Sequence, residues 1–233
     1  MQTPLCPSPD MPDFLVLALQ AVDTADSAQA LIDAVEALSE LQDERAIPTL
    51  IEVLGFNNPG AAVAAVDGLI KIGMPAATPL LEQLDGYNYG ARAWAVRALA
   101  GIGDPRGQEL LIQAAVTDFA MSVRRAAARG LGTIRWQDIP QADRRSRQLR
   151  SQTALLKAIQ DEEWVVRYAA IVGLQALATA LEPTPDTAPS NTEPLATIHN
   201  HLQTLVAQDD TLAVQARSHW ALQSIEEHLK RSI

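Results

Sequence analysis

A short motif of one small residue, one leucine and, three positions later, one aliphatic residue recurs along the chain. The leucines, here called the marker leucines, are Leu38, Leu69, Leu99, Leu131, Leu174 and Leu222. The small residues just before them are Ala37, Gly68, Ala98, Gly130, Gly173 and Ala221, and the aliphatic residues are Leu41, Ile72, Ile102, Ile134, Leu177 and Ile225. This spacing predicts helices whose small residue lets a neighbouring backbone approach.

Most of these helices are preceded by a second apolar stretch with helical spacing, such as "AIPTLIEVL", "AATPLLEQL" and "QELLIQAAV". The motif recurs every ~30 residues at first and at longer intervals later, and helix pairs at such a period are typical of an α-solenoid. No single pair in such an array can bury its own apolar face. The sequence therefore predicts an all-α fold, an α-solenoid of about six helix pairs.

Composition divides the chain into four segments. Residues 1–12 carry four prolines and predict a disordered tail. Residues 13–181 form the main repeat array, in which a polar, basic insertion at residues 135–148 predicts a loop or a helix extension. Residues 182–194, "EPTPDTAPSNTEP", are too rich in Pro, Thr and Ser to pack and predict a mobile linker. Residues 195–233 hold a last helix pair that continues the solenoid.

Residues with restricted backbone preferences mark the helix ends. The prolines expected in first helical turns are Pro48, Pro75 and Pro105. The expected N-caps or turn residues are Asn58, Asn88 and Asp104. The glycines expected to have a left-handed conformation at helix exits are Gly55, Gly73 and Gly103.

The second helix of each pair has a regular charged position. With the marker leucine as position 8, positions 0, 4, 8 and 11 share one buried face, and position 1 is arginine in three repeats, at Arg92, Arg124 and Arg167. An aspartate lies shortly before each of these arginines, at Asp85, Asp118 and Asp161, and Asp209 precedes the last second helix. This regularity predicts an arginine–aspartate ladder that joins adjacent repeats and has a structural role.

Positions 2 and 6 fall on the opposite, open face of the second helices. They hold Arg97, Arg125, Arg129, Tyr168 and Trp220, while Trp94 stands at position 3, at the edge. Residues 120–150 contain eight arginines and two acids in a chain of net charge −10. Arginines beside aromatic rings suit a planar ligand with carboxylates, and equally an acidic protein surface. The alternative is a face that is only solvated.

Composition excludes several function classes. The net charge of −10 argues against a general nucleic-acid binder. No signal sequence or membrane span is apparent, and the single cysteine, Cys6, predicts a reducing cytoplasm. The four histidines, all in the last 35 residues, form no metal-ligand pattern, so no metal is expected. "GIGDPRG" lacks the Lys-Ser/Thr of a phosphate loop, and nothing forms a nucleophile–base set.

The segments "GFNNPGAAVAAVDGLIKIG", "LDGYNYGARAWAVRALAGIGDPRG" and "SVRRAAARGLGTIRW" resemble the HEAT-like repeats of the cyanobacterial phycobilin lyases of the E/F type. The resemblance covers residues 28–180. It implies a heterodimer with a homologous E-type subunit, and thioether attachment of an open-chain tetrapyrrole, phycocyanobilin, to a cysteine of a phycobiliprotein α subunit. The bilin is then a substrate, no cofactor is needed, and the acceptor protein supplies the nucleophile.

This resemblance extends the candidate site. "GYNYG" adds Tyr87 and Tyr89, at the mouth of a helix, to the ligand-binding candidates Trp94, Arg97, Arg125, Arg129 and Tyr168. Packing of the two tyrosines between repeats is the alternative. Asp104 is a candidate acid for stabilising a protonated tetrapyrrole. Related isomerising lyases carry a His–Cys pair in the loop that here reads "FNNPG", residues 56–60, so the chain is expected not to isomerise the bilin.

Three other functions fit parts of the pattern. A phycobilisome adaptor or degradation factor of the same repeat class binds bilin or antenna subunits without transfer. A HEAT-like DNA glycosylase also uses a groove with Trp, Arg and Asp, although overall acidity argues against it. A generic protein-interaction solenoid needs no ligand at all.

Overall fold

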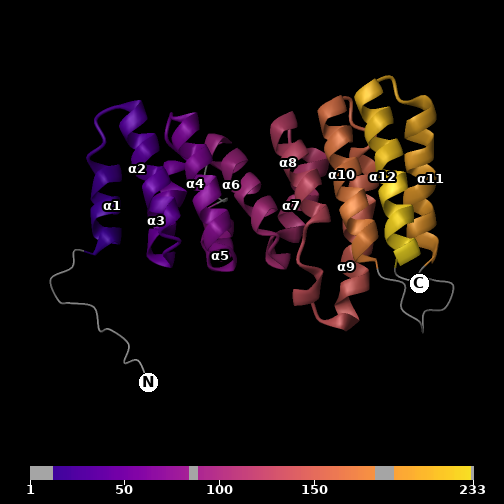
Figure 1. Ribbon diagram of the computed structural model, residues 1–233, viewed down its shortest axis with the longest axis horizontal. Coiled ribbons are helices and arrows are strands. Elements are labelled where there is room, and N and C mark those ends of the chain that lie inside the picture. Colours follow the sequence, from indigo (N-terminus) through magenta and orange to yellow (C-terminus); the bar gives the residue numbers. More distant parts are fainter. Residues whose placement is uncertain (1–12, 84–88, 182–191, 232–233) are drawn as a thin grey trace. The chain divides into compact units, whose positions relative to one another are not determined.

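The computed structural model describes residues 13–83, 89–181 and 192–231, and every regular element in these ranges is helical (Figure 1). The α-helices are α1 (Phe14–Asp23), α2 (Ala28–Glu40), α3 (Ile47–Val53), α4 (Pro59–Ile72), α5 (Ala77–Gln83), α6 (Tyr89–Ile102), α7 (Gln108–Thr117), α8 (Met121–Gly132), α9 (Gln141–Ala158), α10 (Trp164–Ala180), α11 (Thr192–Gln208) and α12 (Leu212–Arg231). Short 3₁₀ turns are η1 (Glu44–Ala46), η2 (Met74–Ala76), η3 (Pro105–Gly107) and η4 (Trp136–Asp138). The predicted all-α array of helix pairs is confirmed.

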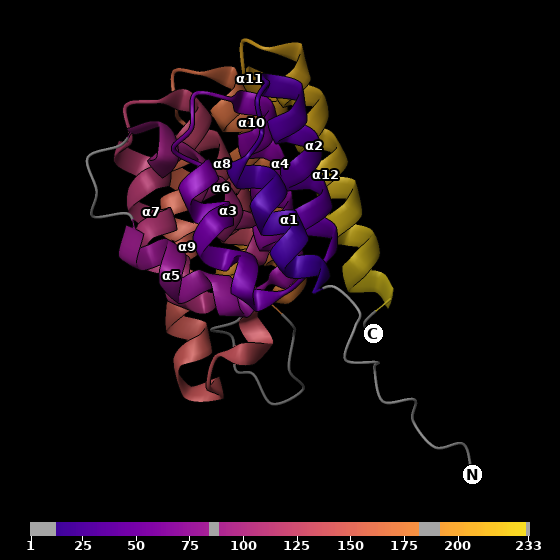
Figure 2. The same ribbon diagram turned by 90° about the vertical axis from the view of Figure 1, so that its left-hand side faces the viewer.

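The chain divides within α6 into two compact units, Met1–Trp94 and Ala95–Ile233. In the first unit α1 packs on α2, α3 on α4, and α2 on α4. In the second unit α7 packs on α8, α11 on α12, and α8, α10 and α12 pack in succession. Figure 2 shows α7 and α9 to one side of α8 and α10. Within each unit the even-numbered, second helices thus pack on one another, and the odd-numbered, first helices cover one side of them.

The buried face of the second helices follows the predicted spacing. In α10, Val166, Ala170, Leu174 and Leu177 occupy positions 0, 4, 8 and 11, and all are fully buried. The earlier marker leucines are buried as well, whereas Leu222 in α12 is only half-buried. Burial of this recurring apolar set is the main favourable contribution to folding of each unit.

Glycines bring second helices into backbone contact. A Cβ atom on Gly173 of α10 would lie 2.5 Å from the carbonyl oxygen of Ala128 in α8. A Cβ atom on Gly132 would lie 2.3 Å from the carbonyl oxygen of Gly173. Neither contact can be relieved by a side-chain rotation, because backbone atoms form it. The predicted role of the small residue before the marker leucine is therefore confirmed at Gly173.

Most predicted helix ends are confirmed. Pro48 lies in the first turn of α3, Asn58 Oδ1 accepts a hydrogen bond from the Ala61 N–H at 3.2 Å, and Gly73 and Gly103 have φ angles of 81° and 69°. The prediction for Gly55 is wrong, since Gly55 does not have a positive φ. Its N–H instead donates to the Glu52 carbonyl at 2.9 Å and continues the last turn of α3. Asn88 lies outside the described residues.

The two irregular segments behave differently. The basic insertion at residues 135–148 forms η4 and the first turns of α9, so a helix extension is present. The predicted linker extends too far, because α11 begins at Thr192 and the buried Pro194 accepts a hydrogen bond from Gln152 Nε2 at 3.0 Å. A proline in the first helical turn loses no hydrogen bond, which explains the earlier start. Residues 1–12 and 182–191 lie outside the described ranges.

Among the described residues, no single helix has both the length and the hydropathy to cross a membrane. Only α4 and the helical segment that follows it pass that test, and then only together, as a pair bent by 115°.

Candidate functional site

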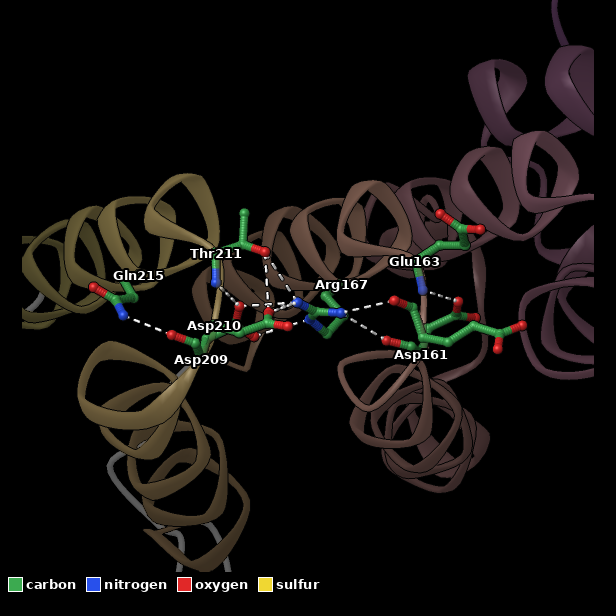
Figure 3. A network of polar contacts seen from close by, with 8 residues as sticks. Asp161, Glu163, Arg167, Asp209, Asp210, Thr211 and Gln215 are labelled. Carbon is green, nitrogen blue, oxygen red and sulfur yellow. Dashed lines mark hydrogen bonds and ion pairs between the residues drawn. The ribbon is translucent and has the colours of Figure 1, made fainter.

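An arginine–aspartate ladder joins the second helices of the second unit to the repeats that follow them. Arg124 Nε and Nη2 donate to the two carboxylate oxygens of Asp161 at 2.7 and 3.0 Å. Arg167 repeats this geometry with Asp209, at 2.8 and 2.9 Å (Figure 3). Each arginine thus forms a bidentate pair with the aspartate that precedes the next second helix. The predicted ladder is confirmed at these two steps.

Each ladder arginine also holds the chain that leads into its own helix. Arg167 Nη1 donates to the carbonyl oxygens of Asp161 and Glu162 at 3.0 and 3.1 Å. Arg124 makes the same contacts with the carbonyls of Asp118 and Phe119. In α12 the equivalent residue is Gln215, which donates to the Asp209 carbonyl at 2.6 Å (Figure 3). The ladder therefore fixes where each second helix begins.

The ladder stays ionised at neutral pH. Burial raises the pKa of Asp161 and of Asp209, but hydrogen bonds from the arginines and from backbone N–H groups outweigh it. Both pKa values consequently lie below the ordinary value of 3.8. The pKa of Arg167 is raised, chiefly by its hydrogen bond to Asp209. Carboxylates held in this way have no proton to donate near neutral pH, so the ladder is a structural device.

The open face of the second unit is the side of α8, α10 and α12 that turns away from the first helices. It carries Arg125 and Arg129 of α8, Tyr168 of α10 and Trp220 of α12, and all four side chains are exposed. Because α8 packs on α10 and α10 on α12, these residues at positions 2 and 6 form one continuous surface. Within the described residues neither Arg125 nor Arg129 makes an ion pair. Both cations are therefore available to an acidic ligand.

Only part of the basic cluster at residues 120–150 lies on this face. Arg144 and Arg147 belong to α9, a first helix, and donate to the carbonyl oxygens of Ile139 and Pro105 at 3.2 Å. Arg150 pairs with Glu109 of α7, and Arg135 pairs with Asp138 at 2.9 Å. Helix pairing therefore divides the arginines of residues 120–150 between two sides of the unit, and only those on the open face support a ligand there.

The remaining predicted site residues belong to the α6 region. Arg97 is exposed at position 6 of α6 and belongs to the second unit. Trp94 is half-buried and is the last residue of the first unit. Tyr87 lies outside the described residues, and Tyr89 is the first residue of α6, its side chain again outside them. The structure therefore unites Arg125, Arg129 and Tyr168, and leaves the two tyrosines of "GYNYG" as predictions.

Asp104 has a structural environment. Its side chain is 1% exposed and accepts hydrogen bonds from the Arg106 backbone N–H at 2.8 Å and from Arg106 Nη2 at 2.6 Å. Burial raises the pKa of Asp104, but the hydrogen bonds from Arg106 outweigh it and leave the pKa below its ordinary value. Both carboxylate oxygens thus hold the start of η3. Because the carboxylate is buried and already paired with Arg106, this arrangement does not support the predicted role of Asp104 in stabilising a protonated tetrapyrrole.

No metal site emerges in the parts of the chain that the structure describes, where no three His, Cys, Asp or Glu residues are grouped to hold an ion. His199 lies 3.7 Å from Glu226, and His201 Nδ1 contacts the Thr197 carbonyl at 2.8 Å within α11. These contacts join α11 to α12 and close one turn of α11.

One cluster on the open face was not predicted as a unit. Arg217 of α12 is only 5% exposed, and its Cζ atom lies 4.4 Å from the ring centroid of Trp220 and 5.9 Å from that of Tyr168. Its Nη2 donates to Gln175 Oε1 at 2.5 Å. The sequence carries one signal for this cluster. Position 3 is alanine in α8 and α10, at Ala126 and Ala169, but arginine in α12, at Arg217.

Comparison with known proteins gives a consistent result. The family model of HEAT repeats matches residues 15–86 and 78–175. The phycocyanin alpha phycocyanobilin lyase CpcF of Synechocystis sp. is 52% identical over 207 residues, which are 89% of this chain and 92% of that protein. The phycocyanobilin lyase subunit beta of Pseudanabaena tenuis is 50% identical over 95% of this chain and 77% of that protein.

A solved structure agrees with these relatives. The complex of CpcE and CpcF of phycocyanin lyase from Nostoc sp. contains a chain that is 47% identical, with a TM-score of 0.67. The match covers 77% of the present chain and 99% of that chain.

Proposed function

The chain belongs to the F-type, or beta, subunits of the phycocyanobilin lyases, and from this membership we propose its activity. Together with a homologous E-type subunit, it attaches phycocyanobilin through a thioether to a cysteine of the phycocyanin α subunit. The observation that carries this proposal is 52% identity over 92% of the length of a CpcF lyase. A match of that extent leaves no further domain of the relative to supply the function.

The proposed role of this chain is to bind and orient the bilin. Attachment is an addition: the cysteine sulfur of the acceptor bonds to the ethylidene group of the bilin, and the thiol hydrogen ends on the chromophore. No group leaves, and neither an oxidant nor a reductant is consumed. Such a reaction gains most from holding the two reactants in a productive orientation. A lyase subunit whose sequence shows no nucleophile–base set is suited to that task.

The open face supplies groups of the right chemistry. Arg125 and Arg129 offer cations to the two propionates of the bilin or to an acidic acceptor surface, and Tyr168 offers an aromatic ring. We propose Arg97 and Trp94 of α6, together with Tyr87 and Tyr89 of the "GYNYG" segment, as further ligand contacts. Bilin isomerisation is not part of the proposal, because the "FNNPG" loop lacks the His–Cys pair of isomerising relatives. The site of action is the cytoplasm, and the bilin is a substrate rather than a cofactor.

Reconstitution tests this proposal. The purified chain, an E-type subunit, phycocyanobilin and the apo-phycocyanin α subunit are combined, and covalent bilin fluorescence is read on a denaturing gel. We expect rapid, site-specific attachment only when both subunits are present. Efficient attachment by this chain alone would refute the heterodimer. Tight bilin or antenna binding without transfer, in the presence of the partner, would instead identify a phycobilisome adaptor.

A further inference from the structure

Among the residues that the structure describes, Arg217 is a buried cation without a counter-charge. It is 5% exposed, its Nη1 is buried without a hydrogen-bond partner, and among the ion pairs of the described residues none includes it. Arg167, which is similarly buried, meets the carboxylates of both Asp209 and Asp210. Burying a guanidinium group without a carboxylate is unfavourable, and burial accordingly lowers the pKa of Arg217. Repeat packing alone does not require it, because alanine occupies the same position in α8 and α10.

The neighbours of Arg217 hold it in place. Gln175 Oε1 accepts from Arg217 Nη2 at 2.5 Å, and Gln175 Nε2 donates to Ser224 Oγ at 2.7 Å. The second hydrogen bond fixes which amide atom faces the guanidinium group. Gln175 therefore orients Arg217 without neutralising it, and one edge of the cation remains unused.

Two aromatic rings border this cation on the open face. The ring centroid of Trp220 lies 4.4 Å from Arg217 Cζ, and that of Tyr168 lies 5.9 Å away. Trp220 is 58% exposed and Tyr168 is 38% exposed, although both are large and apolar. Since most of the Trp220 side chain is already in solvent, it can rotate away from the guanidinium group without leaving a cavity in the core. We expect this rotation to be the route by which a ligand reaches the unpaired Nη1.

We propose that Tyr168, Arg217 and Trp220 form a binding site for one carboxylate of an extended, conjugated ligand. The carboxylate pairs with Nη1 of Arg217, and the conjugated system stacks on the exposed rings. This inference deepens the proposed function and rests on it for the identity of the ligand, a propionate of the open-chain tetrapyrrole. It adds Arg217 and Trp220 to the substrate-binding residues, with Gln175 as the residue that positions Arg217, and places one propionate beside α10 and α12.

The test compares two forms of one probe. Phycocyanobilin, as the free diacid and as its dimethyl ester, is titrated into the full-length chain by isothermal calorimetry. We expect the wild type to bind the diacid about tenfold more tightly than the ester, as for a hydrogen bond to a charged group. Arg217→Met reduces this preference and leaves ester affinity nearly unchanged, because one propionate loses its partner while the other can still pair with Arg125 or Arg129. Trp220→Ala weakens both forms alike, because it removes stacking. Arg231→Met, an exposed arginine on the same helix, changes neither.

Three outcomes overturn the proposal. They are a wild type that does not distinguish diacid from ester, an Arg217→Met variant that keeps the full preference, and a variant that loses only its affinity for the E-type partner. The last result would mean that a protein carboxylate fills the site. If Arg217→Met does not fold, Arg217→Lys decides the question, since lysine keeps the charge but has one nitrogen in place of the separate Nη1 and Nη2 atoms of the guanidinium group. A lysine variant that keeps the full preference for the diacid would overturn the proposed geometry. The transfer assay tests the proposed function separately. If the chain prefers the diacid but never supports attachment, the binding site is supported and the proposed function is refuted.

Discussion

Removing Arg167 from the ladder should destabilise the second unit far more than removing an exposed arginine. Arg167→Met takes away a guanidinium group that makes a bidentate pair with Asp209 and two hydrogen bonds to carbonyl oxygens. The Asp209 side chain is 4% exposed, so it is left buried and unpaired. Breaking a buried ion pair in this way costs about 3–5 kcal/mol, and the Thr211 N–H that remains on Asp209 favours the lower end.

That magnitude sets the expected readout. A loss of about 3 kcal/mol lowers the melting temperature by roughly 6–12 °C for a chain of this size. Thermal and urea unfolding, followed by circular dichroism, measure it. Arg231→Met is the matched control: its pair with Glu227 spans 3.8 Å between exposed side chains, and its removal should change stability by less than about 0.5 kcal/mol. Adding Asp209→Asn to Arg167→Met should recover at least about 1 kcal/mol, because the unpaired buried charge is removed.

The pH dependence provides an independent check. The folded-state pKa of Asp209 lies below its unfolded value, so the pair contributes stability that is present above the unfolded pKa and is lost as pH falls through the folded pKa. The difference between wild type and Arg167→Met should therefore shrink in acid, below the ordinary carboxyl pKa of 3.8. A loss of under about 1 kcal/mol at neutral pH, or strictly additive effects in the double variant, would contradict this account of the ladder.

Two further substitutions test packing and capping. Gly173→Ala should destabilise the protein by about 1–3 kcal/mol, because the new Cβ meets the backbone of Ala128. Gly60→Ala is the control and should cost little, since its Cβ meets the flexible end of the Ile32 side chain. Equal melting temperatures for the two variants would refute the close helix contact. Asp104→Asn should cost about 0.5–2 kcal/mol by weakening the cap of η3. Because the pKa of Asp104 is lowered in the folded state, this cost should fade as pH drops through that pKa, and a loss of transfer activity at unchanged stability would instead restore a direct role for Asp104.

The sequence predicted the features that depend on local spacing. The marker leucines, Gly173 and the ladder arginines recur at fixed positions of a helix, and helical periodicity alone decides which face each one occupies. The partner of Arg124 follows from the same register, since Asp161 precedes the next second helix by a constant interval. These predictions needed no knowledge of how distant segments meet.

The sequence could not predict features that depend on which helix a residue belongs to. Arg125 and Arg147 belong to the same basic cluster and have the same side chain. Arg125 lies on the open face of α8, whereas Arg147 lies on α9 and donates to the Pro105 carbonyl. Trp94 occupies position 3 of α6, at the edge of the open face. Arg217 occupies the same position of α12 but is buried, because α12 packs on α10 and brings Gln175 and Tyr168 against it. Only the three-dimensional contacts separate these cases.

The central claim is that the open face holds the bilin or its acidic acceptor. The most direct test is the transfer rate of the reconstituted pair of subunits with Arg125→Ala/Arg129→Ala, beside Arg45→Ala, an exposed arginine elsewhere in the chain. We expect the double variant to melt within a few degrees of the wild type but to transfer bilin at least about tenfold more slowly, while the control keeps the wild-type rate. Wild-type transfer by the double variant, or slow transfer explained by unfolding, would contradict the claim.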